Sequence, residues 1–276
     1  MPGSWRGWVD GMPELPEVES VRRQLEPELV GRTIIEVWVD DHPAQRFHAV
    51  PSAAGHRMLD VRRRGKFLLL TLDEDRELLL HLGMTGSFRF DVRDKHARAV
   101  FELDDGRALV FRDPRRFGRV SVVDLGDHAV SPTLATLGPE PLGDDFTVQG
   151  FAAALARTGS TVKAALLGQK IVAGVGNIYA DEALWRARIR PTSRRVGSAR
   201  AAVLHQALRE VIAEAIEREG TTFSDYQMVN GESGRNAAFL QAYGQQGLPC
   251  QRCGTEMRKA VVAGRGTTWC PQCQKV

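Results

Sequence analysis

The first regular pattern in the chain is helical. In residues 17–30 the apolar side chains recur every three or four positions, and Gly31 follows the last of them. The positions concerned are Val18, Val21, Leu25 and Leu29. This spacing predicts an amphipathic helix, because it places the four side chains on one face, and a glycine commonly stands just past a helix end.

Short β-type segments follow this helix. Each is rich in aliphatic, branched or aromatic residues, and Gly, Pro, Asp or Ser residues separate it from the next. The segments are residues 33–39, 66–72, 77–81, 87–90, 100–103, 108–112 and 119–123. Many short strands at such spacing predict an antiparallel sandwich or barrel.

The period changes after Leu-Gly-Pro-Glu-Pro-Leu at residues 137–142, which therefore predicts a linker. Helical spacing follows in residues 146–156, 162–167, 178–187 and 199–219. We expect an α+β protein with an antiparallel β-sandwich and flanking helices, then a helical region, then a small cysteine-containing unit. The expected boundaries are 12–142, 143–243 and 244–276.

Composition and charge narrow the class of protein. The chain has 276 residues, 43% hydrophobic and 26% charged, which is ordinary for a globular protein of two domains. The sequence shows no run of about 18 apolar residues and no secretory leader, so we expect a soluble cytosolic protein. Residues 1–150 carry 20 basic and 25 acidic side chains (net −5), and residues 151–276 carry 17 and 9 (net +8). The basic half is compatible with a polyanionic partner or with a solvated surface.

Met12-Pro13-Glu14 would have a special meaning at the start of a polypeptide. Removal of an initiating Met12 would leave Pro13 with a free secondary amine, which is a nucleophile. Its attack on C1′ of a sugar would give an iminium ion, and Glu14 could move the protons that ring opening requires. With residues 1–11 attached, the Pro13 nitrogen is an unreactive amide, so we treat residues 1–11 as a non-native or mis-called extension. In the alternative interpretation Pro13 merely opens a loop before a helix.

Three segments of the β-rich half carry side chains suited to DNA. The cations of residues 62–66 could meet a phosphate, or they could be a solvated charge run. The loops at 81–86 and 113–118 contain Met84, Arg115 and Phe117. Met and Phe in such loops are commonly core residues, but an enzyme that extrudes a base needs apolar wedges and hydrogen-bond donors to fill the duplex.

Gly174-Val175-Gly176-Asn177 connects two predicted helices. Glycines allow close backbone approach there, and Asn177 could cap the next helix or offer its amide to a phosphate. A simple connection between helices is the alternative interpretation.

All four cysteines of the chain lie near its end, as two Cys-x-x-Cys pairs sixteen residues apart. They are Cys250, Cys253, Cys270 and Cys273. This spacing predicts a ribbon with one structural Zn²⁺ in a closed tetrahedral site. Two disulfides are the competing interpretation, which is rare in the cytosol, and so small a unit would need metal to keep its shape.

From Met12 almost to its end, the chain resembles the bacterial formamidopyrimidine-DNA glycosylase family. The resemblance is carried by Pro13-Glu14-Leu15-Pro16-Glu17, Arg63-Arg64-Gly65-Lys66, the two loops, the Gly-Val-Gly-Asn segment and the cysteine pairs. It implies a catalytic β-sandwich domain, a helix-two-turn-helix DNA-binding domain and a zinc ribbon. It also implies a catalytic set of Pro13 as nucleophile, Glu14, Lys66 near phosphate and sugar, and Arg265 clamping phosphates and assisting the second elimination.

The same resemblance implies a set of DNA-binding residues. Met84, Arg115 and Phe117 match the intercalating residues, and Lys163 and Asn177 match phosphate contacts. His96 matches a DNA-contacting histidine, although Ala97-Arg98 after it departs from the commoner pattern. The position near Thr158, often basic in relatives, is not basic here, so we expect Arg157 to substitute. Residues 221–235 correspond to a loop that covers the extruded base.

The expected function is that of a bifunctional DNA glycosylase and abasic-site lyase of base excision repair, which removes oxidised purines from damaged double-stranded DNA. We expect a monomer in the bacterial cytosol, associated with the nucleoid when bound to DNA and without a membrane partner. One alternative is an endonuclease VIII-like enzyme for oxidised pyrimidines, although Leu15 resembles the purine branch. The other is a non-catalytic lesion-binding protein, which would result if residues 1–11 were retained.

Overall fold

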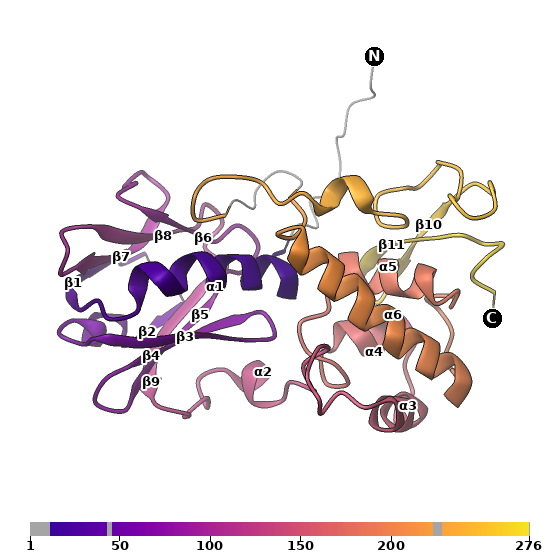
Figure 1. Ribbon diagram of the computed structural model, residues 1–276, viewed down its shortest axis with the longest axis horizontal. Coiled ribbons are helices and arrows are strands. Elements are labelled where there is room, and N and C mark those ends of the chain that lie inside the picture. The colour runs from indigo at the N-terminus through magenta and orange to yellow at the C-terminus, as the bar shows by residue number, and fades with distance from the viewer. Residues whose placement is uncertain (1–11, 43–45, 223–227, 276) are drawn as a thin grey trace, which may run out of the picture.

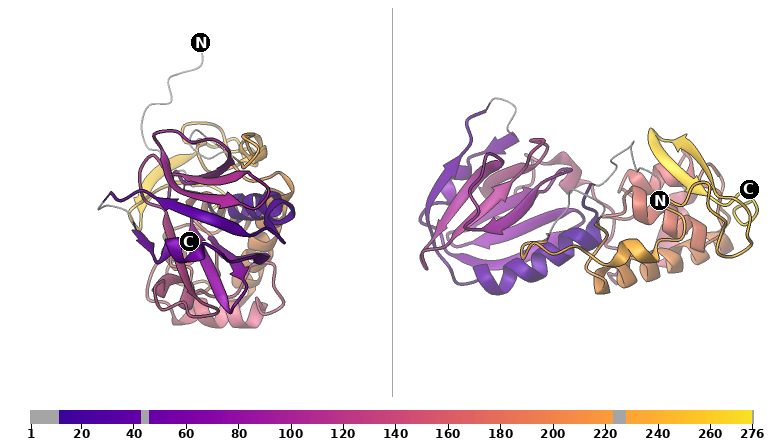
Figure 2. Two further views of the ribbon diagram at one scale, coloured as in Figure 1. Left: turned by 90° about the vertical axis from the view of Figure 1, so that its left-hand side faces the viewer. Right: turned by 90° about the horizontal axis from the view of Figure 1, so that it is seen from above.

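The computed structural model describes residues 12–42, 46–222 and 228–275 of the protein. In these ranges the molecule is elongated, with a β-rich part and a helical part joined at a narrower middle (Figure 1; Figure 2). The proposed extension at residues 1–11 lies outside the described residues. None of the helices within the described ranges has the length and apolar character needed to cross a membrane.

Helix α1 (Leu15–Leu29) confirms the first predicted element and begins two residues earlier than expected. Its four predicted apolar residues are fully buried in the core of the β-rich part. Pro16 stands in the first turn, where its missing N–H costs nothing, and the Glu17 carboxylate accepts a hydrogen bond from the Glu14 amide at 2.8 Å. The helix start is therefore fixed by local chemistry as well as by burial.

Two sheets form a sandwich, as predicted, around one apolar core. The four-stranded sheet has the order β1 (Ile34–Val39), β7 (Ala97–Leu103), β8 (Ala108–Arg112), β6 (Ser87–Phe90). The five-stranded sheet has the order β2 (Arg46–His48), β9 (Arg119–Asp124), β5 (Arg76–His81), β4 (Phe67–Leu72), β3 (Met58–Arg64). A short 3-10 helix, η1 (Val50–Ala53), joins β2 to β3.

The five-stranded sheet contains two strands that the sequence patterns did not predict. Strand β3 includes Arg62, Arg63 and Arg64, so these cations lie within a strand, and Gly65 and Lys66 form the turn into β4. Strand β2 pairs in parallel with β9, which departs from the predicted antiparallel pattern. Both strands are half polar, so they lacked the apolar run expected of a core strand.

The helical part confirms the predicted helices to within two residues at each end. It contains α3 (Val148–Arg157), α4 (Val162–Leu167), α5 (Asn177–Arg186) and the long α6 (Ser198–Glu217), preceded by the short α2 (Pro132–Ala135). These helices surround a second apolar core. The predicted linker at 137–142 runs between α2 and α3 (Figure 1).

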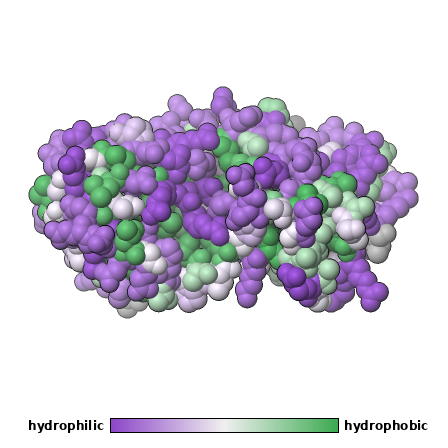
Figure 3. All heavy atoms as spheres, turned by 60° about the horizontal axis from the view of Figure 1, so that its bottom comes forward, coloured by the Kyte–Doolittle hydropathy of each residue, from purple (hydrophilic) through white to green (hydrophobic). Residues whose placement is uncertain are grey.

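The chain then returns to the β-rich part before it forms the ribbon. In this return segment, residues 228–235, Met228 and Val229 join the core of the sandwich, and the Asn230 amide donates to Gln24 Oε1 of α1 at 3.2 Å. The 3-10 helix η2 (Asn236–Phe239) leads back to the hairpin of β10 (Arg258–Val262) and β11 (Arg265–Trp269). Figure 3 shows that hydrophilic residues cover most of one long face across both parts, with apolar residues in separate groups.

Candidate active site

The carboxylate of Glu14 lies at the N-terminus of α5, although the two residues are far apart in the sequence. Its oxygens accept hydrogen bonds from the amides of Gly176 at 2.7 Å, Ile178 at 2.8 Å and Tyr179 at 3.4 Å. The first helical turn offers unpaired amides and a positive dipole end, which suit an anion. Burial nevertheless raises the pKa of Glu14, and the nearby Lys66 and these amides oppose that shift in part. Glu14 is therefore held in one place and can exchange a proton closer to neutral pH than an exposed carboxyl.

Glu17 supports Glu14 from the first turn of α1. It is 1% exposed and accepts hydrogen bonds from the Glu14 amide, from the Thr221 amide at 2.6 Å and from the Tyr179 hydroxyl. Burial, and then the charge of Glu14, raise the pKa of Glu17 to about 7. The sequence had offered Glu17 only as part of a family motif, and its partners show that it joins α1 to α5 and to the segment after α6.

Lys66 meets Glu14 beside Gly176. A Cβ atom on Gly176 would lie 2.4 Å from Glu14 Cδ and 2.6 Å from Lys66 Nζ, so these two atoms are at most 5.0 Å apart, the sum of the two distances. Burial lowers the pKa of Lys66, Glu14 and Glu17 oppose this shift, and Arg265 lowers the pKa further. Glycine is required at 176 because a side chain would displace both catalytic candidates.

Pro13 directly precedes this pair and is buried. The structure therefore brings Pro13, Glu14 and Lys66 together at the junction of α1, the β3–β4 turn and α5. The charge of Arg265 reaches the same place, since it acts on the pKa of Lys66. Their individual chemical roles stay predictions.

The hairpin that carries Arg265 is held by a buried ion pair. Lys163 on α4 is fully buried and donates to Asp181 Oδ1 at 2.6 Å and to Thr267 Oγ1 at 2.7 Å. Asp181 on α5 also accepts from the Thr268 amide at 2.9 Å. The Lys163 ammonium thus has its partners inside the protein, and the predicted phosphate contact would require it to exchange them.

Asn177 takes part in the same junction. Its side-chain amide donates to the carbonyl of Gly266, next to Arg265, at 3.0 Å, and its Oδ1 is buried without a partner among the described residues. The expectation that Asn177 could cap α5 is wrong, because Gly176 occupies the N-cap position and Asn177 is the first helical residue. The predicted phosphate contact stays a prediction.

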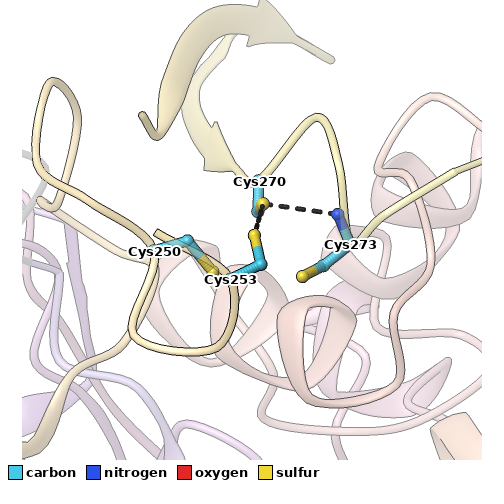
Figure 4. Close-up of side chains that lie close together, drawn as sticks. All are labelled: Cys250, Cys253, Cys270 and Cys273. Carbon is cyan, nitrogen blue, oxygen red and sulfur yellow. Dashed lines mark hydrogen bonds between the residues drawn. The ribbon is translucent and has the colours of Figure 1, made fainter. Parts of the chain in front are cut away.

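The four cysteines gather at the other end of the ribbon (Figure 4). Their sulfur atoms all lie within 4.8 Å of one another, and those of Cys253 and Cys270 are 3.5 Å apart. A disulfide bond would be about 2.05 Å long, whereas sulfurs around a tetrahedral zinc are about 3.8 Å apart. The four thiol groups therefore fit one structural zinc ion with no open position, and the disulfide alternative is wrong for this structure.

The zinc ribbon is docked on α5 through one of its two cysteine turns. Arg252, between the first two cysteines, donates to the carbonyl of Trp185 at 2.9 Å and lies 3.9 Å above the centre of its ring. Zinc would thus fix a turn that already contacts the helix holding Glu14 at its other end. The metal would supply shape there and no chemistry.

The two loops with predicted intercalating residues touch each other. Buried Asp113 accepts from Thr85 Oγ1 at 2.5 Å and from the Gly118 amide at 2.7 Å, which ties the loops together. Phe117 is 38% exposed and lies 4.9 Å below the guanidinium of Arg115, while Met84 is half-buried. One exposed aromatic ring beside a cation and one half-buried methionine thus lie on adjoining loops, which is compatible with the predicted wedge.

Two further predicted DNA contacts lie at the edges of these regions. The carbonyl of His96 accepts from the Asp113 amide at 2.9 Å, so His96 lies beside the wedge loops. The unusual Arg98 after it is buried and donates to the carbonyl of Asp113, which gives it a structural role. Arg157 is exposed at the end of α3, in the helical part. Nothing in this geometry assigns either residue to a particular phosphate.

His81 is a site residue that the sequence reasoning missed. It ends β5, packs against the ring of Phe67 at 4.7 Å, and accepts a hydrogen bond from the Gly83 amide at its Nδ1. Burial, and then the charge of Lys66, lower the pKa of His81 to about 4, so the ring is neutral near pH 7. Its position as the first residue of the 81–86 loop, three residues before Met84, was the available signal.

Three family models match the chain in sequence order. They are described as the formamidopyrimidine-DNA glycosylase N-terminal domain (residues 12–120), the formamidopyrimidine-DNA glycosylase H2TH domain (137–227) and the zinc finger found in FPG and IleRS (247–276). A formamidopyrimidine-DNA glycosylase from Deinococcus radiodurans is 48% identical, over 95% of this chain and 97% of its own. The chain belongs to the formamidopyrimidine-DNA glycosylase family.

Solved structures agree with this assignment to the formamidopyrimidine-DNA glycosylase family. The crystal structure of the MutM (Fpg) protein from Thermus thermophilus superposes with a TM-score of 0.90, at 48% identity, over 95% of this chain and 98% of its own. A complex of a Lactococcus lactis Fpg mutant with a Fapy-dG containing DNA has a TM-score of 0.88 at 35% identity, over 96% of this chain and 100% of its own. The predicted family and fold class are confirmed.

Proposed function

We propose that this chain is a DNA glycosylase and abasic-site lyase of base excision repair that removes oxidised purines from damaged duplex DNA. The observation that carries the proposal is the meeting of Glu14 and Lys66 at the N-terminus of α5, directly behind Pro13. Three segments far apart in the sequence build this arrangement in a member of the glycosylase family. The enzyme acts in the bacterial cytosol, on the nucleoid.

The reaction begins with the amine of Pro13, in a polypeptide processed to start there. Its lone pair bonds to C1′ of the damaged nucleotide, and the electrons of the base–sugar bond leave with the base, which takes up a proton. Glu14 gives a proton to the sugar ring oxygen as the ring opens to an iminium ion, which its raised pKa favours. The iminium acidifies the C2′ hydrogen, so the 3′ and then the 5′ phosphate are eliminated and a one-nucleotide gap remains.

Cations around the sugar serve the charged parts of the substrate. Lys66 and Arg265 stabilise the phosphates on either side of the extruded nucleotide, and Arg265 assists the second elimination. Met84, Arg115 and Phe117 fill the space that the extruded base leaves in the duplex and contact the unpaired base of the opposite strand. His96, Arg157, Lys163 and Asn177 are proposed backbone contacts, and for Lys163 this requires release from Asp181.

Borohydride trapping tests the covalent chemistry. With a duplex that contains 8-oxoguanine opposite cytosine, reduction should give a covalent protein–DNA adduct. The intact mass of the reactive protein should equal that of a polypeptide whose first residue is Pro13. Trapping should be lost in Pro13→Gly if that ring nitrogen is indispensable. An adduct formed equally by protein that begins upstream of Pro13 would exclude the mechanism, and a preference for thymine glycol would exclude the purine assignment.

A further inference from the structure

One buried hydrogen-bond donor beside the four cysteines has no ordinary partner. Trp185 is the second-last residue of α5, and it is 8% exposed in a cluster that also contains Cys250 and Cys270. Its indole N–H is buried and makes no hydrogen bond of ordinary geometry with any described residue. An indole nitrogen donates and does not accept, so a buried indole without an acceptor is costly and indicates that an acceptor is missing.

The sulfur of Cys250 is the acceptor that this N–H reaches. The backbone amides of Arg252 and Cys253 donate to the same sulfur from within the ribbon. A neutral thiol is a weak acceptor, whereas a zinc-bound cysteine is a thiolate and accepts charge-assisted hydrogen bonds. The unsatisfied indole of Trp185 therefore fits a negative charge on Cys250, which a zinc ion held by the four cysteines would stabilise.

Arg252 holds the ring of Trp185 in this orientation. Its guanidinium lies 3.9 Å from the ring centre, and it donates to the Trp185 carbonyl at 2.9 Å. Arg252 lies between Cys250 and Cys253, in the first cysteine turn (Figure 4). The face of the indole is thus covered by this turn, while its N–H is directed at the first sulfur of the same turn. An aromatic residue that merely filled space would need neither contact.

We propose that the indole N–H of Trp185 donates a hydrogen bond to the zinc-bound thiolate of Cys250, and that this bond couples zinc binding to the docking of the ribbon on α5. Donors to metal ligands fix the orientation of the ligand, and their loss commonly lowers metal affinity by about tenfold to a hundredfold. Trp185 is a positioning residue in this inference, which does not depend on the proposed DNA chemistry. Because α5 also binds Glu14 at its N-terminus, one helix connects the zinc site with the candidate active site.

Cadmium NMR tests the hydrogen bond directly. In the full chain loaded with ¹¹³Cd in place of zinc, the metal should show a scalar coupling to the indole proton of Trp185, because such couplings are transmitted through N–H···S hydrogen bonds. The amide protons of Arg252 and Cys253 should show the same kind of coupling and serve as positive controls. The indole proton of Trp38, which is half exposed on β1, should show none.

A substitution tests the effect on the metal. Trp185→Phe keeps an aromatic ring beside Arg252 and removes the N–H, so it should release zinc to a chelator about tenfold faster than the unaltered protein. In the cobalt-substituted protein, its sulfur-to-metal charge-transfer band should move to longer wavelength, because a thiolate that loses a donor gives up its electrons more readily. Met257→Leu is the control, since Met257 is buried in the same cluster and the change conserves its volume.

Because the NMR measurement uses the unaltered chain, it tests the proposal even if Trp185→Phe does not fold. Absence of a coupling to Trp185, in a spectrum that shows couplings to the amides of Arg252 and Cys253, would overturn the proposal. So would a Trp185→Phe protein whose zinc release and charge-transfer band both equal those of Met257→Leu.

Discussion

The two parts of the molecule bring residues to one site with very different support. Lys66 directly precedes strand β4, which contributes to a large apolar core, and Glu14 is the N-cap of helix α1, which packs on the same core. Arg265 instead stands on a two-stranded hairpin, whose small apolar cluster consists of Trp185, Ala242, Met257 and two cysteines. The β-rich part holds its site residues without metal, whereas the ribbon depends on zinc and on a few buried polar contacts.

The basic side chains of the two parts differ in whether a nearby acidic side chain neutralises them. In the β-rich part, Arg63 pairs with Glu19 and Glu140, and Arg116 pairs with Asp40. In the helical part and the ribbon, Arg157, Arg190, Arg258 and Lys259 take part in no ion pair within the described ranges. The net charge of +8 in the second half thus includes several cations without a nearby acidic side chain. This favours the interpretation as a surface for a polyanionic partner over the interpretation as a solvated surface.

The largest effect should come from Gly176→Ala, where the two parts meet. The added methyl group would lie 2.4 Å from Glu14 Cδ and 2.6 Å from Lys66 Nζ, so both groups must move. A displacement of about 1 Å at catalytic groups can cost roughly a hundredfold, and we expect a loss of at least that size in single-turnover base release. Gly168→Ala is the matched control, because its nearest contacts would be 3.5 Å. A Gly176→Ala variant as active as Gly168→Ala would contradict the arrangement.

Loss of zinc should affect only one side of the comparison. Cys253→Ser should release the metal and weaken binding to lesion-containing DNA, by roughly tenfold to a hundredfold at physiological salt, because the ribbon contacts are lost. The near-ultraviolet circular dichroism that arises from the aromatic side chains of the β-rich part should be retained. Undiminished affinity in a metal-free variant would show that the ribbon is not part of the DNA clamp.

A smaller effect, about tenfold in DNA affinity or in the second elimination, is expected for Asp181→Asn. This change unpairs buried Lys163 and frees the residues next to Arg265. If Asp181 acts by positioning Arg265, the substitution should add little in an Arg265→Ala background, as a double-mutant cycle would measure. Asp124→Asn is the control, since its ion pair with Arg76 is at the surface and Asp124 is 77% exposed. Fully additive effects of Asp181→Asn and Arg265→Ala would refute the positioning role.

The smallest effect should be a pH dependence of the free energy of unfolding that arises from Glu17. Glu17 has a pKa of about 7 in the folded state against 4.5 for an ordinary glutamate, so the folded protein binds more protons between these values. Stability from this group is present below pH 4.5 and is lost as the pH rises toward 7. The melting temperature should fall by a few degrees over this range, and less so in Glu17→Gln. An identical pH profile for both proteins would show that Glu17 is not protonated in the folded state.

Much of the fold followed from local patterns in the sequence. The predicted helix at 17–30, the helices of the second half and the cysteine spacing all reflect interactions between near neighbours, and the structure contains them. Strand β3 was missed because its arginines look like a solvated run, whereas Glu19 and Glu140, from distant segments, neutralise Arg63. Burial of charge by remote partners leaves no periodic signal.

The site shows the same limit more strongly. The resemblance pointed to Pro13, Glu14 and Lys66. The partners of Glu17 could not be found in this way, because Tyr179 is 162 residues away in the sequence and Thr221 is 204 residues away. Lys163 looked like a cation for phosphate, and its burial against Asp181 and Thr267 depends on how the ribbon docks. Sequence motifs identified the chemistry, and the folded structure determined which groups support it.

The return segment has a mechanical consequence. Because Met228 and Val229 are anchored in the sandwich core, the polypeptide crosses the narrow middle at more points than the stretch 137–142. A protease that cleaves within residues 137–142 would leave two fragments that stay associated, because Met228 and Val229 remain buried in the sandwich core. The return segment therefore restrains the narrow middle of the molecule, and bending there would have to pull Met228 out of the core.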